Sequence, residues 1–296
     1  SITLNGSSTV VVEFGSLYID AGATALDTLD QNLTANIVVV NPVNTNSTST
    51  FTITYNVSDS SGNPADEVTR TVIVEDNEAP IITLNGSSTI IHEAGTLYVD
   101  EGAIATDNVG GNITGSIVTT STVNVSVIGD YVVRYDVTDS SGNIATSVTR
   151  IVNVVDTTPP NLILLGDNPQ IIEGGSPYVE LGATSSDIVF GNLTGSIDVD
   201  ISGINTFATG TQIVVYTITD GSNNTASATR TVIIQDTTAP LISITGQNPL
   251  IIEAGDDYTE LGATSTDIVD GNLTGSIVID TSGLSTSTLG NSFVVY

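Results

Sequence analysis

The sequence predicts an all-β protein, a tandem array of small antiparallel β-sandwiches that forms an elongated rod. Three observations predict it: one pattern returns every 80 residues, short segments alternate between apolar and polar residues, and turns rich in Gly, Asn and Asp separate these segments. A fixed period of this length indicates one folding unit copied head to tail, so we expect the function to lie in the array and its joints. The residues that mark the period are Gly6, Gly86, Gly166 and Gly246; Glu13, Glu93, Glu173 and Glu253; Tyr18, Tyr98, Tyr178 and Tyr258; and Asp27, Asp107, Asp187 and Asp267.

The period divides the chain into four repeats, at residues 1–80, 81–160, 161–240 and 241–296. The fourth repeat stops at Tyr296, the counterpart of Tyr55 and Tyr135, so we expect it to be truncated and to lack its last strand. Natural proteins seldom leave such a sheet edge unpaired. Two explanations stay open: the array continues past this segment, or a strand from another chain completes the sandwich.

The strands of the repeat can be located in its second copy. Thr and Val dominate it, and no stretch shows the 3.6-residue period of a helix, so we expect almost no helix. The run Asp-Ser-Ser-Gly-Asn at residues 139–143 is typical of a turn between two strands. We expect a split first strand at residues 81–84 and 89–93, a second strand at 98–105, a third from 117, and a hairpin that pairs 131–138 with 144–155.

The composition excludes several classes of function. The chain has no cysteine, so disulfides and thiolate metal sites are excluded, and small extracellular domains without disulfides often depend on a bound metal. The 33 acidic residues against 4 arginines give a net charge of −29, which repels nucleic acid and anionic lipid and attracts divalent cations. No run of about 18 apolar residues occurs, so we expect no membrane insertion. A saline or calcium-rich exterior suits this composition.

Four segments of the second repeat carry a resemblance to a known family. They are Tyr-Val-Asp-Glu-Gly-Ala at residues 98–103, residues 107–114, residues 135–143, and Asp-Thr-Thr-Pro-Pro at residues 156–160. With their counterparts they resemble the bacterial Ig-like repeats of surface adhesins, including the type also found in a pesticidal crystal protein, and in outline hyalin-type and cadherin repeats. The resemblance implies an Ig-like sandwich in every repeat and a stalk or spacer at the cell surface. Val137 would take the place of the core cysteine that follows a tyrosine on this strand of Ig sandwiches.

Acidic residues recur in register at five positions of the repeat, and sandwich topology predicts that most of them converge on the joints. The first-strand turn and the linker of one repeat should meet two loops of the next. Carboxylates gathered at one place cannot all stay unpaired. Oxygen ligands on loops suit Ca²⁺, which takes six to eight of them, whereas Mg²⁺ would keep more water. The predicted metal ligands are Glu13, Asp20, Asp76, Asp107, Asp139, Glu93, Asp100, Asp156, Asp187, Asp220, Glu173, Glu180, Asp236 and Asp267.

The linkers at residues 76–80 and 236–240 resemble the calcium-binding linkers of cadherins but carry fewer acids, so we expect one or two ions at each joint. Two alternatives stay open. Asp and Asn at the start of a loop form Asx-turns without any metal, and an acidic surface by itself keeps a long fibre soluble. One further position is Asp30, Gly110, Phe190 and Asp270 in the four copies; it does not keep its charge, and we interpret it as drift.

Two other sets of polar residues keep the register. Arg70, Arg150 and Arg230 fall on the last strand, and each is predicted to pair with a carboxylate of its own repeat. Asn-x-Thr triplets fall on a turn in all four copies, where a glycan could be accommodated if the source cell makes N-glycans. The predicted glycosylation positions are Asn32, Asn112, Asn192 and Asn272.

We expect a structural or adhesive extracellular protein and no enzyme. Without Cys or Lys, and with a single histidine that does not recur, a nucleophile and its base cannot be assembled. The expected partners are neighbouring repeats, other copies in a filament, and an unknown surface ligand bound at a tip outside this segment. The alternative function is an array of carbohydrate- or protein-binding modules. Such modules need exposed aromatic rings, whereas eight of the nine tyrosines fall at recurring strand positions.

Overall fold

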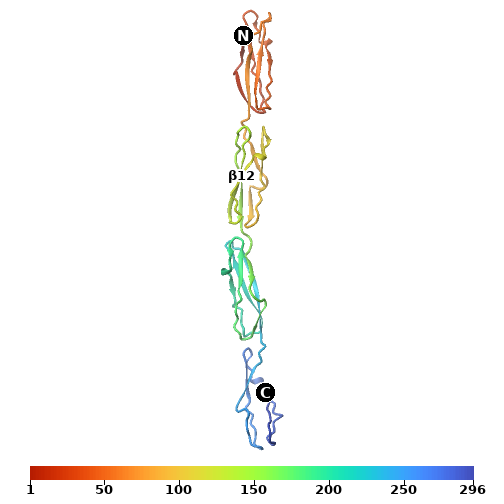
Figure 1. Ribbon diagram of the computed structural model, residues 1–296, viewed down its shortest axis with the longest axis vertical. Coiled ribbons are helices and arrows are strands. Elements are labelled where there is room, and N and C mark those ends of the chain that lie inside the picture. Colours follow the sequence, from red (N-terminus) through yellow and green to blue (C-terminus); the bar gives the residue numbers. More distant parts are fainter. The chain divides into compact units, whose positions relative to one another are not determined.

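A computed structural model describes residues 1–296, and its secondary structure is almost entirely β (Figure 1). The helices are four 3₁₀ turns of three residues each: η1 (Thr34–Asn36), η2 (Thr114–Ser116), η3 (Thr194–Ser196) and η4 (Thr274–Ser276). None of them has the length or hydropathy of a helix that could cross a membrane. The chain divides into two compact units, Ser1–Val155 and Asp156–Tyr296, and each is described by itself.

The first repeat forms two sheets. One has the strand order β1-β3-β4, from β1 (Ile2–Leu4), β3 (Ala23–Asp27) and β4 (Gln31–Asn32). The other has the order β2-β7-β6-β5, from β2 (Thr9–Glu13), β7 (Val68–Glu75), β6 (Thr50–Asn56) and β5 (Val38–Val40). Every pair is antiparallel except β2 with β7, the first and last strands of the second sheet along the chain, which run parallel.

The second repeat has the same plan and completes the first unit. Its three-stranded sheet is β11-β10-β8, from β11 (Gly111–Asn112), β10 (Ala103–Asp107) and β8 (Ile81–Leu84). Its four-stranded sheet is β12-β13-β14-β9, from β12 (Val118–Ser121), β13 (Gly129–Asp136), β14 (Val148–Val155) and β9 (Thr89–Glu93). Figure 1 shows β12 among strands of neighbouring colour, because both sheets of this repeat are built from the one stretch of chain between residues 81 and 155.

The second unit contains a third pair of sheets and one further sheet. The pair is β15-β17-β18, from β15 (Asn161–Leu164), β17 (Ala183–Asp187) and β18 (Gly191–Asn192), and β16-β21-β20-β19, from β16 (Gln170–Glu173), β21 (Thr225–Gln235), β20 (Gly210–Thr219) and β19 (Asp198–Asp200). The further sheet is β22-β23-β24, from β22 (Leu241–Ile244), β23 (Ala263–Asp267) and β24 (Gly271–Asn272). After it, residues 275–296 make one isolated bridge, Asp280 with Val295.

The sequence pattern explains these elements. Strand residues alternate between exposed and buried, as in β6, where Ile53 and Tyr55 point into the core. In the first repeat Ile53 and Val72 pack with Ala23 of the other sheet, so the two sheets share one core. The all-β prediction of tandem sandwiches is confirmed, and so is the split first strand, seen as β8 and β9. The repeat boundaries at residues 80, 160 and 240 stay a prediction.

One predicted strand is shorter than expected. The sequence predicts a strand at residues 98–105, but β10 begins only at Ala103. The backbone before it turns, because the Asp100 carboxylate accepts a hydrogen bond from the amide of Gly102 at 2.9 Å. Apolar alternation alone does not show this turn, since Tyr98 and Val99 have the composition of a strand.

Each of the first three repeats changes sheets soon after its first strand, and a glycine makes this possible. In the first repeat the chain leaves β1 at Leu4 and enters β2 at Thr9. Gly6 lies between them with φ 83°, in the left-handed region that costs side-chain-bearing residues strain. Gly86 has φ 74° at the same place in the second repeat. The recurring glycine is therefore a requirement of the sheet change.

A buried arginine holds this sheet change in place. Arg70 is 1 % exposed, and its guanidinium donates hydrogen bonds to the backbone carbonyls of Ser7 at 2.9 Å, of Gly22 at 3.3 Å and of Asn5. Arg150 donates to the corresponding carbonyls of the second repeat, including that of Ser87 at 2.9 Å. One side chain thus bonds three backbone carbonyls, of which that of Gly22 also accepts the amide of Asn5 at 3.0 Å.

The charge of the buried arginine is balanced within its own repeat. Arg70 is paired with the Asp20 carboxylate, which also accepts hydrogen bonds from the hydroxyls of Tyr55 at 2.7 Å and Tyr18 at 3.1 Å. The same arrangement joins Arg150 to Asp100 in the second repeat. In the third repeat Glu180 lies 3.9 Å from Arg230, and the hydroxyl of Tyr216 accepts a hydrogen bond from Arg230 Nε at 2.9 Å. The prediction that the arginines pair within their repeats is confirmed.

Replacing this arginine should lower the stability of its own repeat and leave the neighbouring repeat almost unchanged. We expect Arg150→Met to destabilise the second repeat by about 3–5 kcal/mol, because Asp100 and the carbonyls of the sheet change lose their buried partner. Hydrogen exchange read by mass spectrometry should show faster exchange of amides in residues 81–155 and little change in residues 1–75. The matched control is Arg134→Met, since Arg134 is exposed and paired only with side chains at the surface. Equal effects of the two substitutions would contradict the assigned role.

Candidate metal centres

Carboxylates gather in three groups, each of which joins a linker aspartate to loops of the repeat that follows it. Within a group, one carboxylate oxygen from every member lies within 4.8 Å of the others. The first group lies in the first unit and the other two lie in the second unit. The groups are Asp76, Asp107 and Asp139; Asp156, Asp187 and Asp220; and Asp236, Asp267 and Asp270.

Asp107 is held by the turn that follows β10. Its Oδ2 accepts hydrogen bonds from the backbone amides of Val109 and Gly110, both at 3.0 Å. This is an Asx-turn, as the metal-free alternative expected. The turn uses only one of the two carboxylate oxygens, because Asp107 Oδ1 is buried without a hydrogen-bond partner. The turn therefore positions the carboxylate and leaves one oxygen free for another ligand.

Asp139 opens the hairpin loop between β13 and β14. Its Oδ1 accepts the amides of Ser141 and Asn143, both at 2.8 Å, and its Oδ2 accepts the side-chain amide of Asn143 at 2.8 Å. Asn143 also donates to the backbone carbonyl of Asp76 at 3.0 Å, and the Ser141 hydroxyl donates to Asp76 Oδ2 at 2.8 Å. The loop thus carries its aspartate and binds the linker at the same time.

The second group repeats these contacts in a more buried setting. Asn224 donates to the carbonyl of Asp156 at 3.1 Å and to Asp220 Oδ2 at 3.0 Å, as Asn143 does in the first group. Asp156 and Asp220 are each 7 % exposed. Asp156 Oδ2 is buried and has no hydrogen-bond partner. A buried charged oxygen without a partner is costly to a folded protein, so this group calls for a counter-charge.

The donor set fits a hard divalent cation. All members of the groups are aspartates, and the loops add backbone carbonyls, serine hydroxyls and asparagine amides. Oxygen donors of this kind suit Ca²⁺ and Mg²⁺, while Zn²⁺ prefers the nitrogen and sulfur of His and Cys. Three negative charges within 4.8 Å of one another repel, and a bound cation would turn that repulsion into attraction.

Eight of the predicted ligands lie in these groups: Asp76, Asp107, Asp139, Asp156, Asp187, Asp220, Asp236 and Asp267. The predicted glutamates do not. Glu13 lies beside the first linker, where its carboxylate accepts the backbone amide of Asn77 at 2.9 Å. Glu173 accepts the amide and the hydroxyl of Thr237, both at 2.8 Å. These two residues bind the linker to the preceding repeat, and Glu93, the third of the series, belongs to none of the three groups.

Three other predicted ligands were misplaced, because Asp20, Asp100 and Glu180 lie beside the buried arginines. Burial alone would raise the pKa of the Asp20 carboxyl, but hydrogen bonds from Tyr55 and Tyr18 and the charge of Arg70 hold that pKa below its ordinary value. The pKa of Asp100 is lowered in the same way, against burial, by its tyrosines and Arg150. These partly buried carboxylates serve as counter-ions of the buried arginines, away from the three groups.

The sequence reasoning also missed residues. Asp270 belongs to the third group, although its position was interpreted as drift because Gly110 and Phe190 occupy it in other repeats. Ser141 and Asn143, which bind the first linker, were interpreted only as turn residues. The signal that could have found Asp270 is its place three residues after Asp267, in a loop that was already expected at the joint.

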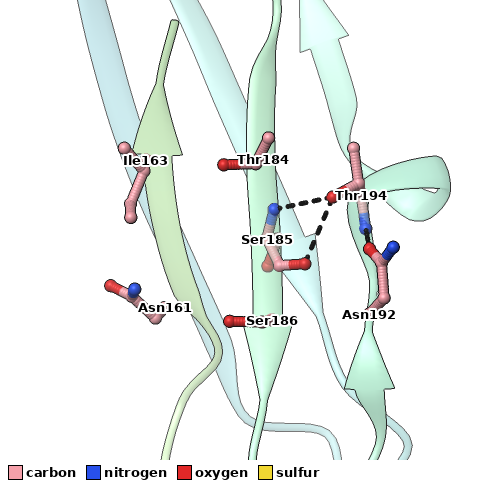
Figure 2. A pocket seen from close by; sticks show the side chains of 7 residues that line it. All are labelled: Asn161, Ile163, Thr184, Ser185, Ser186, Asn192 and Thr194. Atoms are coloured by element: carbon pink, nitrogen blue, oxygen red, sulfur yellow. Dashed lines mark hydrogen bonds between the residues drawn. The ribbon is translucent and has the colours of Figure 1, made fainter.

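The Asn-x-Thr triplets have a structural role in every repeat. Figure 2 shows the third: Asn192 accepts the amide of Thr194 at 3.0 Å, and the Thr194 hydroxyl accepts the amide of Ser185 at 3.1 Å. Asn192 and Thr194 line a hollow of about 280 Å³ together with Asn161, Ile163, Thr184, Ser185 and Ser186. Asn32, Asn112 and Asn272 make the same bond to the threonine that follows. This turn is sufficient reason for the triplets to recur, and glycosylation stays a prediction.

Three segments of the chain, residues 2–74, 82–154 and 162–234, match the family described as bacterial surface protein, Ig-like domain. Hyalin of Strongylocentrotus purpuratus is 33 % identical over 231 residues, which cover 72 % of this chain and 19 % of hyalin. The pesticidal crystal protein Cry22Aa of Bacillus thuringiensis is 27 % identical over 283 residues, which cover 92 % of this chain and 38 % of that protein. The chain thus spans less than half the length of these relatives. The human cadherin fragment CDH23 EC21-23 is 15 % identical, with 76 % of this chain and 98 % of the fragment covered and a TM-score of 0.29.

Acid should weaken the arginine clusters, and the lowered pKa of Asp100 gives the sign. Unfolding returns this carboxyl to its ordinary pKa near 3.9, so the unfolded state binds more protons and stability falls as pH drops through and below that value. We expect the destabilisation caused by Asp100→Asn to be largest at pH 7 and to shrink towards pH 3, in urea unfolding followed by tyrosine fluorescence. Subtracting the free energy of unfolding of Asp100→Asn from that of the wild-type chain at each pH cancels the general effect of titrating the acidic surface. A difference that stays constant with pH would contradict this account.

Proposed function

The chain belongs to the family of bacterial surface proteins with Ig-like domains, and from this premise we propose that it is a structural, adhesive segment of an extracellular stalk or filament. In this proposal, Ca²⁺ bound by the three carboxylate groups restricts the linkers and keeps the array extended. The resemblance to bacterial Ig-like repeats that the sequence predicted is confirmed by the family match over three segments. The role of this chain and its cation are our inference from the sites.

The observation that carries the proposal is the buried Oδ2 of Asp156, which has no partner although it belongs to a group of three carboxylates. Asx-turns account for the bonded oxygens of Asp187 and Asp220. They do not account for a charged oxygen that has lost its water. A cation at this place would supply the missing partner, and Asp107 Oδ1 supports the same inference for the first group.

A cation at these groups would act on the linker, since each group brings one linker aspartate against two loops of the following repeat, or one loop in the third group. In the first unit the linker is already bound on both sides, by Glu13 to Asn77 and by Asn143 to the Asp76 carbonyl. These bonds, together with those of the Asn77 side-chain amide to Glu13 and of Ser141 to Asp76 Oδ2, are each worth about 1 kcal/mol. Several Ca²⁺–carboxylate bonds would fix the same segment much more firmly. The ion would thus stiffen the linker.

The recurring tyrosines do not support the alternative of a carbohydrate-binding array. Tyr55, Tyr135 and Tyr216 are at most 1 % exposed, and each hydroxyl is engaged with the arginine cluster of its repeat. Aromatic platforms for sugars need exposed rings. We therefore propose a non-enzymatic role whose partners are neighbouring repeats and other copies of the filament, with a surface ligand bound elsewhere in the whole protein.

Calcium should stabilise the chain measurably. At a free concentration 100 times the Kd, each occupied site should add about 2.7 kcal/mol, because the folded state alone presents the three carboxylates together. The melting temperature followed by circular dichroism should therefore rise by several degrees with CaCl₂ and fall again with EDTA. Small-angle scattering should show a narrower range of chain dimensions when calcium is present.

The variant Asp156→Asn with Asp187→Asn should lose part of this response. The control is Asp198→Asn, which removes an exposed charge of β19 that belongs to none of the groups. We expect the control to keep the full calcium-induced shift. A wild-type chain that responds to neither CaCl₂ nor EDTA would refute the metal part of the proposal and leave the family assignment standing.

A further inference from the structure

One position beside the carboxylate groups differs between repeats. It is Gly110 at the first group, Phe190 at the second and Asp270 at the third, and its counterpart in the first repeat is Asp30. We infer that the residue at this position sets how tightly, and for how long, its group holds a divalent cation. The inference rests on the proposed function, because it assigns different strengths to sites that the proposal treats alike.

The backbone of this position is fixed in the same way in every copy. The amide of Gly110 donates to Asp107 Oδ2 at 3.0 Å, and that of Phe190 donates to Asp187 Oδ1 at 3.0 Å. The amide of Asp270 donates to its own loop aspartate, also at 3.0 Å. The side chain therefore starts from one point, three residues after a predicted ligand, whatever residue is present. Only its chemistry changes from group to group.

Phe190 covers the loop of the second group. A Cβ atom added to Gly221 would lie 2.4 Å from Phe190 Cε1, so the ring occupies the space that a side chain at residue 221 would need. In the second repeat the counterpart of Gly221 is Ser140, and the counterpart of Phe190 is Gly110. The large ring at residue 190 thus coincides with the absence of a side chain at residue 221. Asp220, which precedes Gly221 in the chain, is 7 % exposed, whereas Asp139, its counterpart, is only partly buried.

Where this position is an aspartate, as in Asp30 and Asp270, its carboxylate also lies against the loop or the carboxylates of the site. Asp30 accepts hydrogen bonds from the amide of Ser60 at 2.8 Å and from its hydroxyl at 3.0 Å, in the loop that corresponds to residues 139–143. The carboxylate of Asp270 lies within 4.8 Å of those of Asp236 and Asp267. A side chain at this position can therefore shield the group, join it as a ligand, or leave it open.

These differences predict a ranking of the first two groups, which have equal formal charge. Asp156 Oδ2 has no partner, while its counterpart Asp76 Oδ2 accepts the Ser141 hydroxyl. An ion bound at the second group would therefore meet one carboxylate oxygen, Asp156 Oδ2, that has no hydrogen bond to give up. Lower local polarity under Phe190 strengthens its attraction to a cation, and the ring hinders water from replacing a ligand. We expect tighter binding and slower release at the second group than at the first.

The test isolates the second group in the whole chain. Asp76→Asn with Asp107→Asn silences the first group, and Asp236→Asn with Asp267→Asn silences the third. In this background, Phe190→Gly should weaken Ca²⁺ binding at least tenfold by calorimetry and speed its release to a chelator in stopped flow. Phe190→Leu keeps an apolar cover and should change the affinity less than threefold. Hydrogen exchange in EDTA verifies that the variants are folded.

The reciprocal graft keeps the inference testable if Phe190→Gly disturbs folding. With the second and third groups silenced, Gly110→Phe and Ser140→Gly should tighten binding at the first group about tenfold. A Cβ at Gly110 would lie 2.7 Å from Ile113 Cγ2, so the graft also includes Ile113→Leu. Leucine is the residue at the corresponding position of the third repeat, Leu193, where it occurs with Phe190. If the wild-type chain binds Ca²⁺ and both the Phe190 variants and the graft keep affinities within twofold of the proteins they were made from, this inference alone is overturned. No binding by the wild-type chain overturns the proposed calcium site and this inference together.

Discussion

Burial of a guanidinium in each complete repeat is the constraint on which the rest of the structure depends. An unpaired arginine in a sandwich core would be strongly destabilising, so its surroundings are built to satisfy it. Arg70 receives one carboxylate, one tyrosine hydroxyl and three backbone carbonyls. The carbonyls come from the segment where the chain changes sheets and from the loop before β3. The side chain therefore fixes both the sheet change and the start of β3.

This constraint separates two populations among the acidic residues of the chain. One carboxylate per complete repeat is the counter-ion of the buried arginine, and its hydrogen-bond partners and that arginine lower its pKa. Another population collects where a linker meets the loops of the repeat that follows, with oxygens left over. A charge of −29 suggests a uniformly acidic surface, but these residues do two separate jobs. The first concerns the stability of one repeat, and the second concerns the connection between repeats.

Much of this could be predicted from the sequence, because a period of 80 residues places equivalent side chains at equivalent points. The sandwich, the split first strand and the internal pairing of the arginines followed from alternation and from the scarcity of cations. Asp20 was misassigned because register shows that a residue recurs and not which partner it faces. Asp270 was missed for the opposite reason: a position that varies can still lie in a site when a backbone bond holds its amide in place. Neither fact is contained in spacing alone.

The parallel pairing of β2 with β7 has a mechanical consequence. These are the first and last strands of their sheet along the chain, and they lie side by side from Thr9 with Thr71 to Glu13 with Glu75. Tension that pulls the two ends of a repeat apart acts along this pair, so its hydrogen bonds are loaded in shear and share the force. An antiparallel hairpin pulled from its open end would instead release its bonds one after another. The connectivity that seems a minor detail of topology gives each complete repeat its resistance to being drawn out.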